Sequence, residues 1–313
     1  REPVMGLWID TDMGFDDLAS VLVLAHAGRQ IDGMSLIAGN SPLETVRSNA
    51  ASAAKLFGWD FPIFTGREKA VLGGLETAQA ILGPRGMQSA GAHLPECRPV
   101  TERCAFGALC KWLEQPAAGD DKKHILALGP LGNLAALALA RPDLARKIDQ
   151  ITWMGGAAGR GNHTALAEYN AFADPEALAI VLAHELPVRM VELDLCRKVI
   201  ATPDDVHAIR IAGGQNASLL ADLTDGYINI GISRGRSGMA IFDPVAAITL
   251  LDPDVVQFAN THVAVDTSHG VARGQTHIDP TATAKFNAQY GVTVDADRAR
   301  TMIFDALKAE AGK

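Results

Sequence analysis

The sequence predicts an α/β fold: an open, mostly parallel central sheet flanked by helices. Short apolar runs alternate with segments of helical periodicity along the first two thirds of the chain. Polar side chains gather where several expected strands end, which is the edge at which open parallel sheets place their ligands. With 313 residues, 48% of them hydrophobic, the chain can bury one large core, so we expect a single domain over residues 1–313.

The expected elements follow one another in a β-α-β-α rhythm. Residues 4–9 form an apolar first strand, and residues 16–27 carry leucines and valines on one side of a helix. Ser41 and Pro42 suit the cap and first turn of the next helix. The remaining expected elements are strands at 31–38, 62–64, 124–128, 148–154 and 187–191, and helices at 43–57, 131–140 and 174–183. Two segments interrupt the rhythm: a Gly- and Pro-rich loop at 66–99, typical of a lid or binding loop, and a mostly helical stretch at 201–239.

Composition excludes several classes of function. The net charge is −8 and no cluster of Lys and Arg occurs, which argues against a nucleic-acid partner. No run of about 18 apolar residues and no basic-then-apolar leader occurs, so we expect no membrane partner and a cytoplasmic protein. The cysteines fit no common zinc pattern and are expected to be reduced; they are Cys97, Cys104, Cys110 and Cys196.

Four carboxylates lie within eight residues, directly after the first expected strand: Asp10, Asp12, Asp16 and Asp17. So many like charges are costly unless a hard cation or a ligand rich in hydroxyl groups neutralises them. Asp16 alone could be a helix N-cap, but capping does not explain all four. Calcium tolerates irregular sets of oxygen ligands better than magnesium does.

Further amides and carboxylates follow later strands or helices. Asn40, Asn162 and Asp243 each have a simple structural explanation, as a helix cap or a turn residue. Glu168 and Asn170 follow the strand that ends near residue 154. Together these side chains line one rim of the sheet, where they suit a polyhydroxylated ligand held partly through a metal.

An ordered set of motifs resembles the inosine–uridine-preferring nucleoside hydrolases over nearly the whole chain. The stretch from Asp10 to Asp17 is similar to the family's DxDxGxDD signature. The other matches, in the family's order, are Ala38-Gly39-Asn40, Leu128-Gly129-Pro130-Leu131-Gly132-Asn133, Met154-Gly155-Gly156, Gly161-Asn162, Glu168-Tyr169-Asn170, Asp174-Pro175-Glu176-Ala177 and Asp243-Pro244. The resemblance implies a Rossmann-like nucleoside hydrolase fold, a ribonucleoside substrate, and a homodimer or homotetramer.

The same resemblance implies a role for each residue of the site. A calcium ion (Ca2+) would be held by Asp12, Asp17, Asp243 and the backbone carbonyl of Leu128, and would also bind the catalytic water and two ribose hydroxyls. Asp16 and Asn170 would hold the 2′ side of the ribose. Its 5′ side would contact Asn162, Glu168 and Met154. Asn40 would lie near the reacting carbon, and Asp10 would support the metal-binding loop from behind.

The residue types suit hydrolysis of an N-glycosidic bond. Bond cleavage builds positive charge on the ribose, which a pocket dense in carboxylates stabilises. A metal lowers the pKa of its bound water, and Asp12 can take the proton as general base. A single displacement by that water predicts inversion at the anomeric carbon.

The chain departs from the family where the leaving base is expected. Many members have a histidine just before the late Asp-Pro, and this chain has Phe242 at that position. Many also have a histidine before a glycine in the long loop, and this chain has no histidine there. The candidates for contact with the base are Phe242, Tyr227, Arg234, Arg236, Arg85, His93 and His163. Because some purine-preferring relatives rely on aromatic stacking, Phe242 favours purine nucleosides slightly.

Two other interpretations stay open at this point. One is a nucleoside or sugar binder without turnover, since the usual leaving-group histidines are missing. The other is a phosphatase of the haloacid dehalogenase type, with Asp10 as nucleophile, Asp12 as acid–base and magnesium as metal. That second class usually has Gly and a hydroxyl residue after the second Asp, where this chain has Met13 and Gly14.

Overall fold

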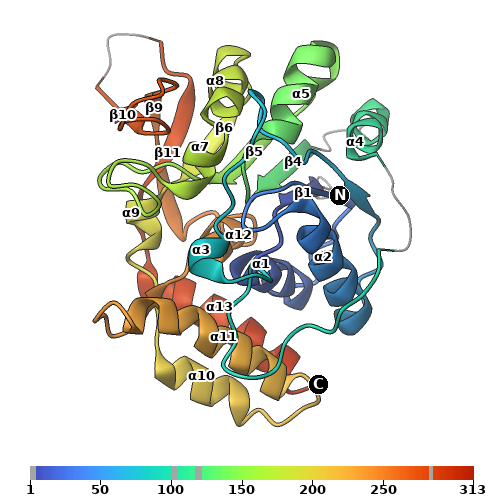
Figure 1. The fold of residues 1–313 in the computed structure, drawn as a ribbon. Helices are drawn as coiled ribbons and strands as arrows, with labels where there is room; N and C mark the ends of the chain where they lie inside the picture. The colour runs from blue at the N-terminus through green and yellow to red at the C-terminus, as the bar shows by residue number, and fades with distance from the viewer. Residues whose placement is uncertain (1–4, 100–103, 117–121, 282–284) are drawn as a thin grey trace.

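The computed structural model describes residues 5–99, 104–116, 122–281 and 285–313, and a nine-stranded sheet runs through this part of the chain (Figure 1). The strands lie in the order β10-β9-β11-β6-β5-β4-β1-β2-β3. Their bounds are Met5–Thr11 (β1), Gly33–Leu36 (β2), Ile63–Thr65 (β3), Lys122–Ala127 (β4), Gln150–Met154 (β5), Val188–Val191 (β6), Val256–Val265 (β9), Thr276–Asp279 (β10) and Ala288–Val294 (β11). A separate antiparallel pair joins Ile200–Ala201 (β7) to Met239–Ala240 (β8).

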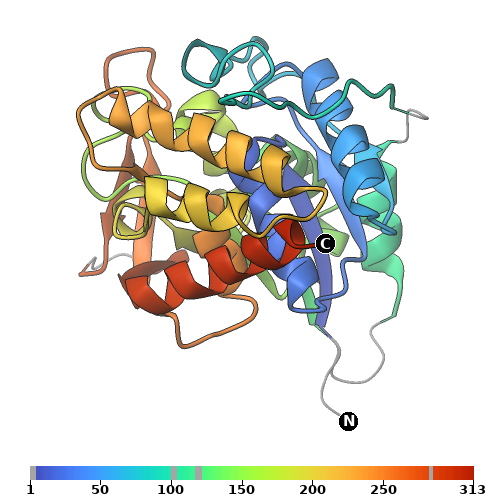
Figure 2. The same cartoon turned by 90° about the horizontal axis from the view of Figure 1, so that it is seen from below.

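Helices cover both faces of the sheet. They are Phe15–His26 (α1), Leu43–Phe57 (α2), Gln79–Leu82 (α3), Ala105–Glu114 (α4), Gly132–Ala140 (α5), Pro142–Ala145 (α6), Tyr169–Ala173 (α7), Pro175–Ala183 (α8), Leu193–Cys196 (α9), Pro203–Arg210 (α10), Ala217–Ile232 (α11), Asp243–Ile248 (α12) and Ala296–Ala311 (α13). Helices α10, α11 and α13 lie side by side as one layer (Figure 2). None of the helices in the described ranges combines the length and the apolar character that a membrane span needs.

The alternation of side chains along β1 explains the two layers. Leu7 and Ile9 are fully buried in a core with α1, α2, α11, α12 and α13, whereas Trp8 between them belongs to a core with α4, α5 and α8. Because β1 is buried on both faces, its apolar residues are nearly continuous, which is typical of a central parallel strand.

The predicted α/β fold with a mostly parallel sheet is confirmed. Helix α2 has the predicted bounds, and the other predicted strands and helices are found within a few residues of their predicted ends. Sequence patterns did not predict β9, β10 and β11. Strand β11 pairs with β6 in parallel, and β9 pairs antiparallel with both β11 and β10. The stretch 201–239 is mostly helical as expected, and the loop 66–99 contains only the short helix α3 and an isolated bridge.

The topology decides where a ligand site can form. Strand β1 pairs with β2 on one side and β4 on the other, both in parallel, so the order of connection reverses at β1. Ligands of open α/β sheets bind beyond the carboxyl ends of the strands at such a switch point. The Asp10–Asp17 segment leaves β1 at that place.

Candidate active site

The loop between β1 and α1 is held by its own side chains. Met13 has a φ of 48°, in the left-handed region, and its N–H donates to the Thr11 hydroxyl at 3.0 Å. The Thr11 hydroxyl donates to Asp17 Oδ1 at 2.5 Å, and the Gly14 N–H donates to Asp17 Oδ2 at 2.9 Å. Both carboxylate oxygens of Asp17 are therefore fixed by residues of the same loop.

Asp12 is held by Asn40, which follows β2. Asp12 Oδ2 accepts from the backbone N–H of Asn40 at 2.8 Å, and Oδ1 accepts from its Nδ2 at 3.0 Å. Glycine at position 39 permits this approach, because a Cβ there would lie 2.1 Å from Asp12 Oδ2. Burial and the negative charge of Asp17 raise the pKa of Asp12 well above its usual range.

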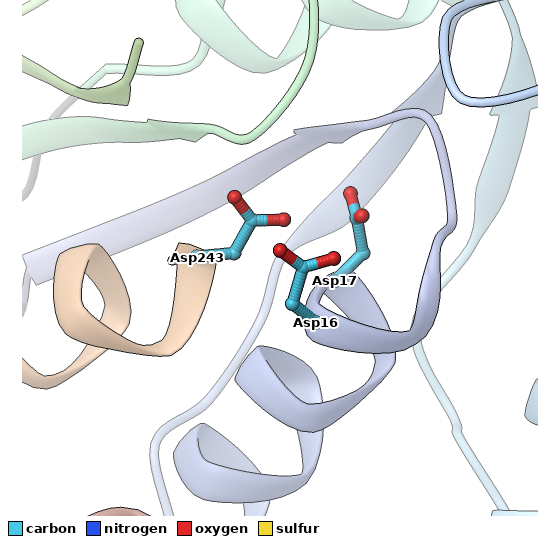
Figure 3. A group of neighbouring side chains, drawn as sticks. All are labelled: Asp16, Asp17 and Asp243. Atoms are coloured by element: carbon cyan, nitrogen blue, oxygen red, sulfur yellow. The ribbon is translucent and has the colours of Figure 1, made fainter. Parts of the chain in front are cut away.

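Three carboxylates form a cluster at the ends of two helices (Figure 3). One oxygen from each of Asp16, Asp17 and Asp243 lies within 4.8 Å of the others. Asp16 and Asp17 are in the first turn of α1, and Asp243 is the first residue of α12, which packs against α1. A divalent cation held by oxygen atoms suits such a set.

Burial makes this cluster costly in the absence of a cation. Burial, followed by the charge of Asp17, raises the pKa of Asp16 to about 7. Burial and the charge of Asp16 raise the pKa of Asp243 well above its usual range, and burial also raises that of Asp17. The donor set and its electrostatics therefore fit a hard metal ion. Asp12 is not one of the three, but it adjoins them: the negative charge of Asp17 raises the pKa of Asp12, and the charge of Asp12 contributes to raising that of Asp243.

Asp10 lies behind this loop and is fully buried. Its Oδ1 accepts from the Ser35 hydroxyl and from Asn133 Nδ2, the latter at 2.7 Å. Burial raises the pKa of Asp10 to about 6. Asp10 joins β1 to β2 and α5 from this position, and it is not among the residues that line the cavity.

Glu168 and Asn170 hold the opposite wall together. Glu168 caps α7 and accepts three backbone N–H groups, from Gly156 at 2.8 Å, Asn170 at 2.7 Å and Ala171 at 3.0 Å. Burial raises the pKa of Glu168 to about 7. Asn170 Nδ2 donates to the carbonyl oxygens of Leu128 at 3.1 Å and Met154 at 2.9 Å, which tie α7 to the ends of β4 and β5.

A cavity of about 240 Å³ opens above these groups. Most of the predicted site residues line it: Asp16, Asn40, Leu128, Met154, Asn162, Glu168, Asn170, Tyr227, Arg234, Arg236, Phe242 and Asp243. Asp12 and Asp17 are outside the lining, with exposures of 1% and 0%. The structure therefore assembles the predicted residues from six separate parts of the chain.

The base candidates differ in what they offer. The Tyr227 hydroxyl donates to the carbonyl oxygen of Ala240 at 2.8 Å, so its hydrogen is not free to bond a ligand. Arg234 and Arg236 are exposed where they line the cavity. Phe242, which directly precedes α12, is half-buried.

Two of the predicted base candidates do not line the cavity. His93 is exposed, does not line the cavity, and lies near Asp222, whose pKa its charge helps to lower. Arg85 donates to the carbonyl oxygen of Leu94 at 3.3 Å and pairs with Glu96 at 3.4 Å, also outside the cavity. Both belong to the 66–99 loop, whose path no periodicity determines.

Sequence patterns also missed residues that shape the cavity. Ile81 and Leu82 of α3, Ile230 of α11 and Met239 of β8 give it apolar walls. These residues have ordinary helix or strand patterns, so no sequence signal separates them from core residues. Asn133, which orients Asp10, lies in one of the quoted motifs and could have been singled out there.

Comparisons with known proteins agree with this geometry. Residues 7–301 match the family model described as inosine-uridine preferring nucleoside hydrolase. The pyrimidine-specific ribonucleoside hydrolase RihB of Escherichia coli K12 is 28% identical over 294 residues, which is 92% of each chain. The purine-preferring ribonucleoside hydrolase from Gardnerella vaginalis superposes with a TM-score of 0.88 at 25% identity, covering 98% of this chain and 99% of that one.

A third relative has the same architecture. A solved inosine–guanosine nucleoside hydrolase superposes with a TM-score of 0.87 at 25% identity, over 97% of this chain and 99% of that chain. The family match covers both the acid-rich loop after β1 and the Asp243 end of α12. The chain therefore belongs to the inosine–uridine preferring nucleoside hydrolase family and is a ribonucleoside hydrolase.

Proposed function

We propose that this chain catalyses the calcium-dependent hydrolysis of the N-glycosidic bond of ribonucleosides, releasing free base and ribose, with a slight preference for purine nucleosides. The observation that carries the proposal is the cluster of Asp16, Asp17 and Asp243 at a cavity beyond the carboxyl ends of the strands. The acidic cluster can bind a cation, and the amides around the cavity can hydrogen-bond the hydroxyl groups of a sugar.

The residues proposed to hold the cation are Asp12, Asp17, Asp243 and the carbonyl oxygen of Leu128. Asp16, the remaining member of the cluster, lines the cavity and is proposed to contact the ribose instead. Three carboxylates and one carbonyl are hard oxygen donors, and calcium accepts irregular sets of these. When bound, the cation lowers the pKa of the attacking water and offsets the charge of the buried carboxylates.

Asp12 is proposed as the general base. A carboxylate beside a cation-bound water is a group that can take the proton as the water attacks. Asn40 holds both oxygens of Asp12, so the carboxylate is oriented before the substrate enters. Attack by water in a single displacement inverts the anomeric carbon.

The ribose is proposed to bind between two groups of residues. Asp16 and Asn170 take its 2′ side, and Asn162, Glu168 and Met154 take its 5′ side. Asp16 and Glu168 also place negative charge near the ribose, which stabilises the positive charge that develops as the bond to the base breaks. Asp10 supports the loop through Ser35 and Asn133.

The base is proposed to lie against the apolar walls of the cavity, with Phe242 and Tyr227 as aromatic surfaces and Arg234 and Arg236 at the outer side. A purine has the larger stacking area, which favours it at an aromatic wall. The relatives differ in the base they are named for: RihB is named pyrimidine-specific, whereas the Gardnerella enzyme is named purine-preferring.

A substrate panel with and without chelator tests the proposal. It contains purine, pyrimidine and nicotinamide ribosides with 2′-deoxy controls, and release of reducing sugar is measured. We expect activity that chelation removes, poor use of deoxyribosides, and faster turnover of inosine, adenosine or guanosine than of uridine or cytidine. Equal rates on ribosides and deoxyribosides would contradict the roles of Asp16 and Asn170, and a faster rate on uridine would contradict the purine preference.

A non-catalytic binder is the second candidate, because Phe242 stands where many relatives have a histidine. Tight binding of inosine without release of reducing sugar, at saturating calcium, would favour it over the hydrolase. A single domain over residues 1–313, assembly as a homodimer or homotetramer, and a cytoplasmic location also stay predictions.

A further inference from the structure

His163 and Glu76 join two loops that both border the cavity. His163 Nε2 lies 2.9 Å from Glu76 Oε1, although the residues are 87 positions apart in sequence. His163 directly follows Asn162, on the proposed ribose side, and Glu76 precedes α3. Because a carboxylate oxygen only accepts, Nε2 carries the hydrogen of this bond.

The surroundings of His163 fix the ring. Its side chain is 12% exposed, and it packs against Tyr169 and Phe172 with ring centroids 5.2 Å and 4.6 Å apart. The Tyr169 hydroxyl lies 2.5 Å from the carbonyl oxygen of Gly39 and 3.0 Å from that of Glu76. Glu76 is thus held at its side chain by His163 and at its backbone by Tyr169.

The segment held in this way forms part of the cavity wall. Two residues after Glu76, Ala78 begins the turn into α3, and Ala78, Ile81 and Leu82 line the cavity. Helix α3, seen near the centre of Figure 1, has only four residues, and none of them is fully buried. Ile81 and Leu82 are only partly buried where they pack against the core, and Ala78 packs beside Tyr169, so the position of α3 depends in part on the contacts that anchor the segment just before it.

We propose that His163 is a positioning residue that, through Glu76, holds the α3 segment (residues 74–82) over the bound substrate. The inference rests on the proposed function, because it assigns a consequence for substrate binding to a contact beside the ribose-binding residues. The contact links the proposed ribose wall, through Asn162, to the apolar wall that Ile81 and Leu82 supply. Neither His163 nor Glu76 contacts Asp12, so loss of the contact changes substrate retention and leaves the chemical step in place.

The expected effect is modest, because the Glu76 side chain is 66% exposed. A hydrogen bond of this kind between a ring N–H and an exposed carboxylate changes an equilibrium by about two- to five-fold. We therefore expect Glu76→Ala to raise KM by about two- to five-fold with kcat within about two-fold of the parent. His163→Phe, which keeps a ring against Tyr169 and Phe172, is expected to loosen the α3 segment to the same extent.

A double-mutant cycle and amide exchange test the proposal. The variants are Glu76→Ala, His163→Phe and the double variant, with Glu68→Ala as control, since Glu68 is an exposed carboxylate of the same loop. In the ligand-free protein, we expect amide exchange at residues 78–83 to become about two- to five-fold faster in each single variant. The double variant should show no further increase. Glu76→Gln keeps an acceptor oxygen, so its KM should stay close to that of the parent protein.

The two readouts separate failure of this inference from failure of the proposed function. Exchange equal to that of Glu68→Ala, additive effects in the double variant, or faster exchange with unchanged KM would each overturn the positioning role. If the parent protein hydrolyses no riboside, the proposed function fails, and exchange alone still decides whether His163 and Glu76 hold the segment.

Discussion

Replacing Asp12 by Asn separates the chemistry of the site from its architecture. The side chain keeps its size, and one of its two contacts with Asn40 can persist, because the amide oxygen still accepts. At the other contact, the new amide NH2 group would face an N–H donor of Asn40, so that hydrogen bond is lost. The variant loses the ability to take a proton from water, which is the role proposed for Asp12.

The size of the effect follows from that role. A positioned general base contributes about 10²- to 10⁴-fold, which corresponds to about 3–5 kcal/mol of transition-state stabilisation. Stability changes in the other direction. Burial raises the pKa of Asp12 well above its usual range, so a carboxyl group there favours the unfolded state at neutral pH. In the absence of metal, we expect Asp12→Asn to unfold at the same temperature as the parent or higher.

The assay measures release of reducing sugar from inosine at saturating calcium and substrate, with thermal unfolding of the same samples. Calcium should also raise the Tm of the variant less than that of the parent, because Asp12 is a proposed ligand. Asp174→Asn is the matched control: Asp174 is 1% exposed, caps α8, and lies outside the cavity lining. A kcat for Asp12→Asn within ten-fold of the parent, with an intact fold, would remove Asp12 from the mechanism.

The other predictions concern the metal, pH, the ribose and the base. Chelation abolishes turnover and lowers Tm, and calcium at one hundred times its Kd restores about 2.7 kcal/mol of stability; a Tm that does not respond to calcium would contradict the metal site. Without metal, we expect Tm to fall as pH rises from about 4 to 7. The folded pKa values of Asp16 and Glu168 are each about 7, whereas their unfolded values are 3.8 and 4.5. In this range the folded carboxyls therefore keep protons that the unfolded chain has lost. Calcium flattens this dependence, and scanning calorimetry across pH checks both curves. Asn170→Ala lowers kcat/KM about ten-fold or more for inosine and less for 2′-deoxyinosine, and equal losses on both would place Asn170 away from the 2′ hydroxyl. Phe242→Ala lowers kcat/KM for inosine by about two- to ten-fold and changes uridine little, whereas a larger loss on uridine would argue against purine stacking.

The proposed catalytic residues were accessible from the sequence because each lies at the end of a strand or helix with a strong local pattern. The four carboxylates after β1 present an electrostatic problem that local spacing alone reveals. Asn40 could be placed on this rim because parallel strands direct their carboxyl ends to one edge. Asp243 instead follows the separate antiparallel pair β7-β8, so its place in the cluster depends on the packing of α12 against α1. The antiparallel strands β9 and β11 escaped prediction because their side chains alternate irregularly between buried and exposed positions.

The sequence by itself determined the α/β class, the acid-rich loop and the set of amides around it, since these depend on local periodicity and on charge spacing. Only the tertiary structure decided which carboxylates share one cluster, that Asn40 orients Asp12, and that His93 lies outside the cavity lining while His163 binds Glu76 beside the cavity. These contacts join residues that are far apart in the chain, and their distances depend on how loops pack on the finished sheet. No pattern within a short window of sequence encodes that packing.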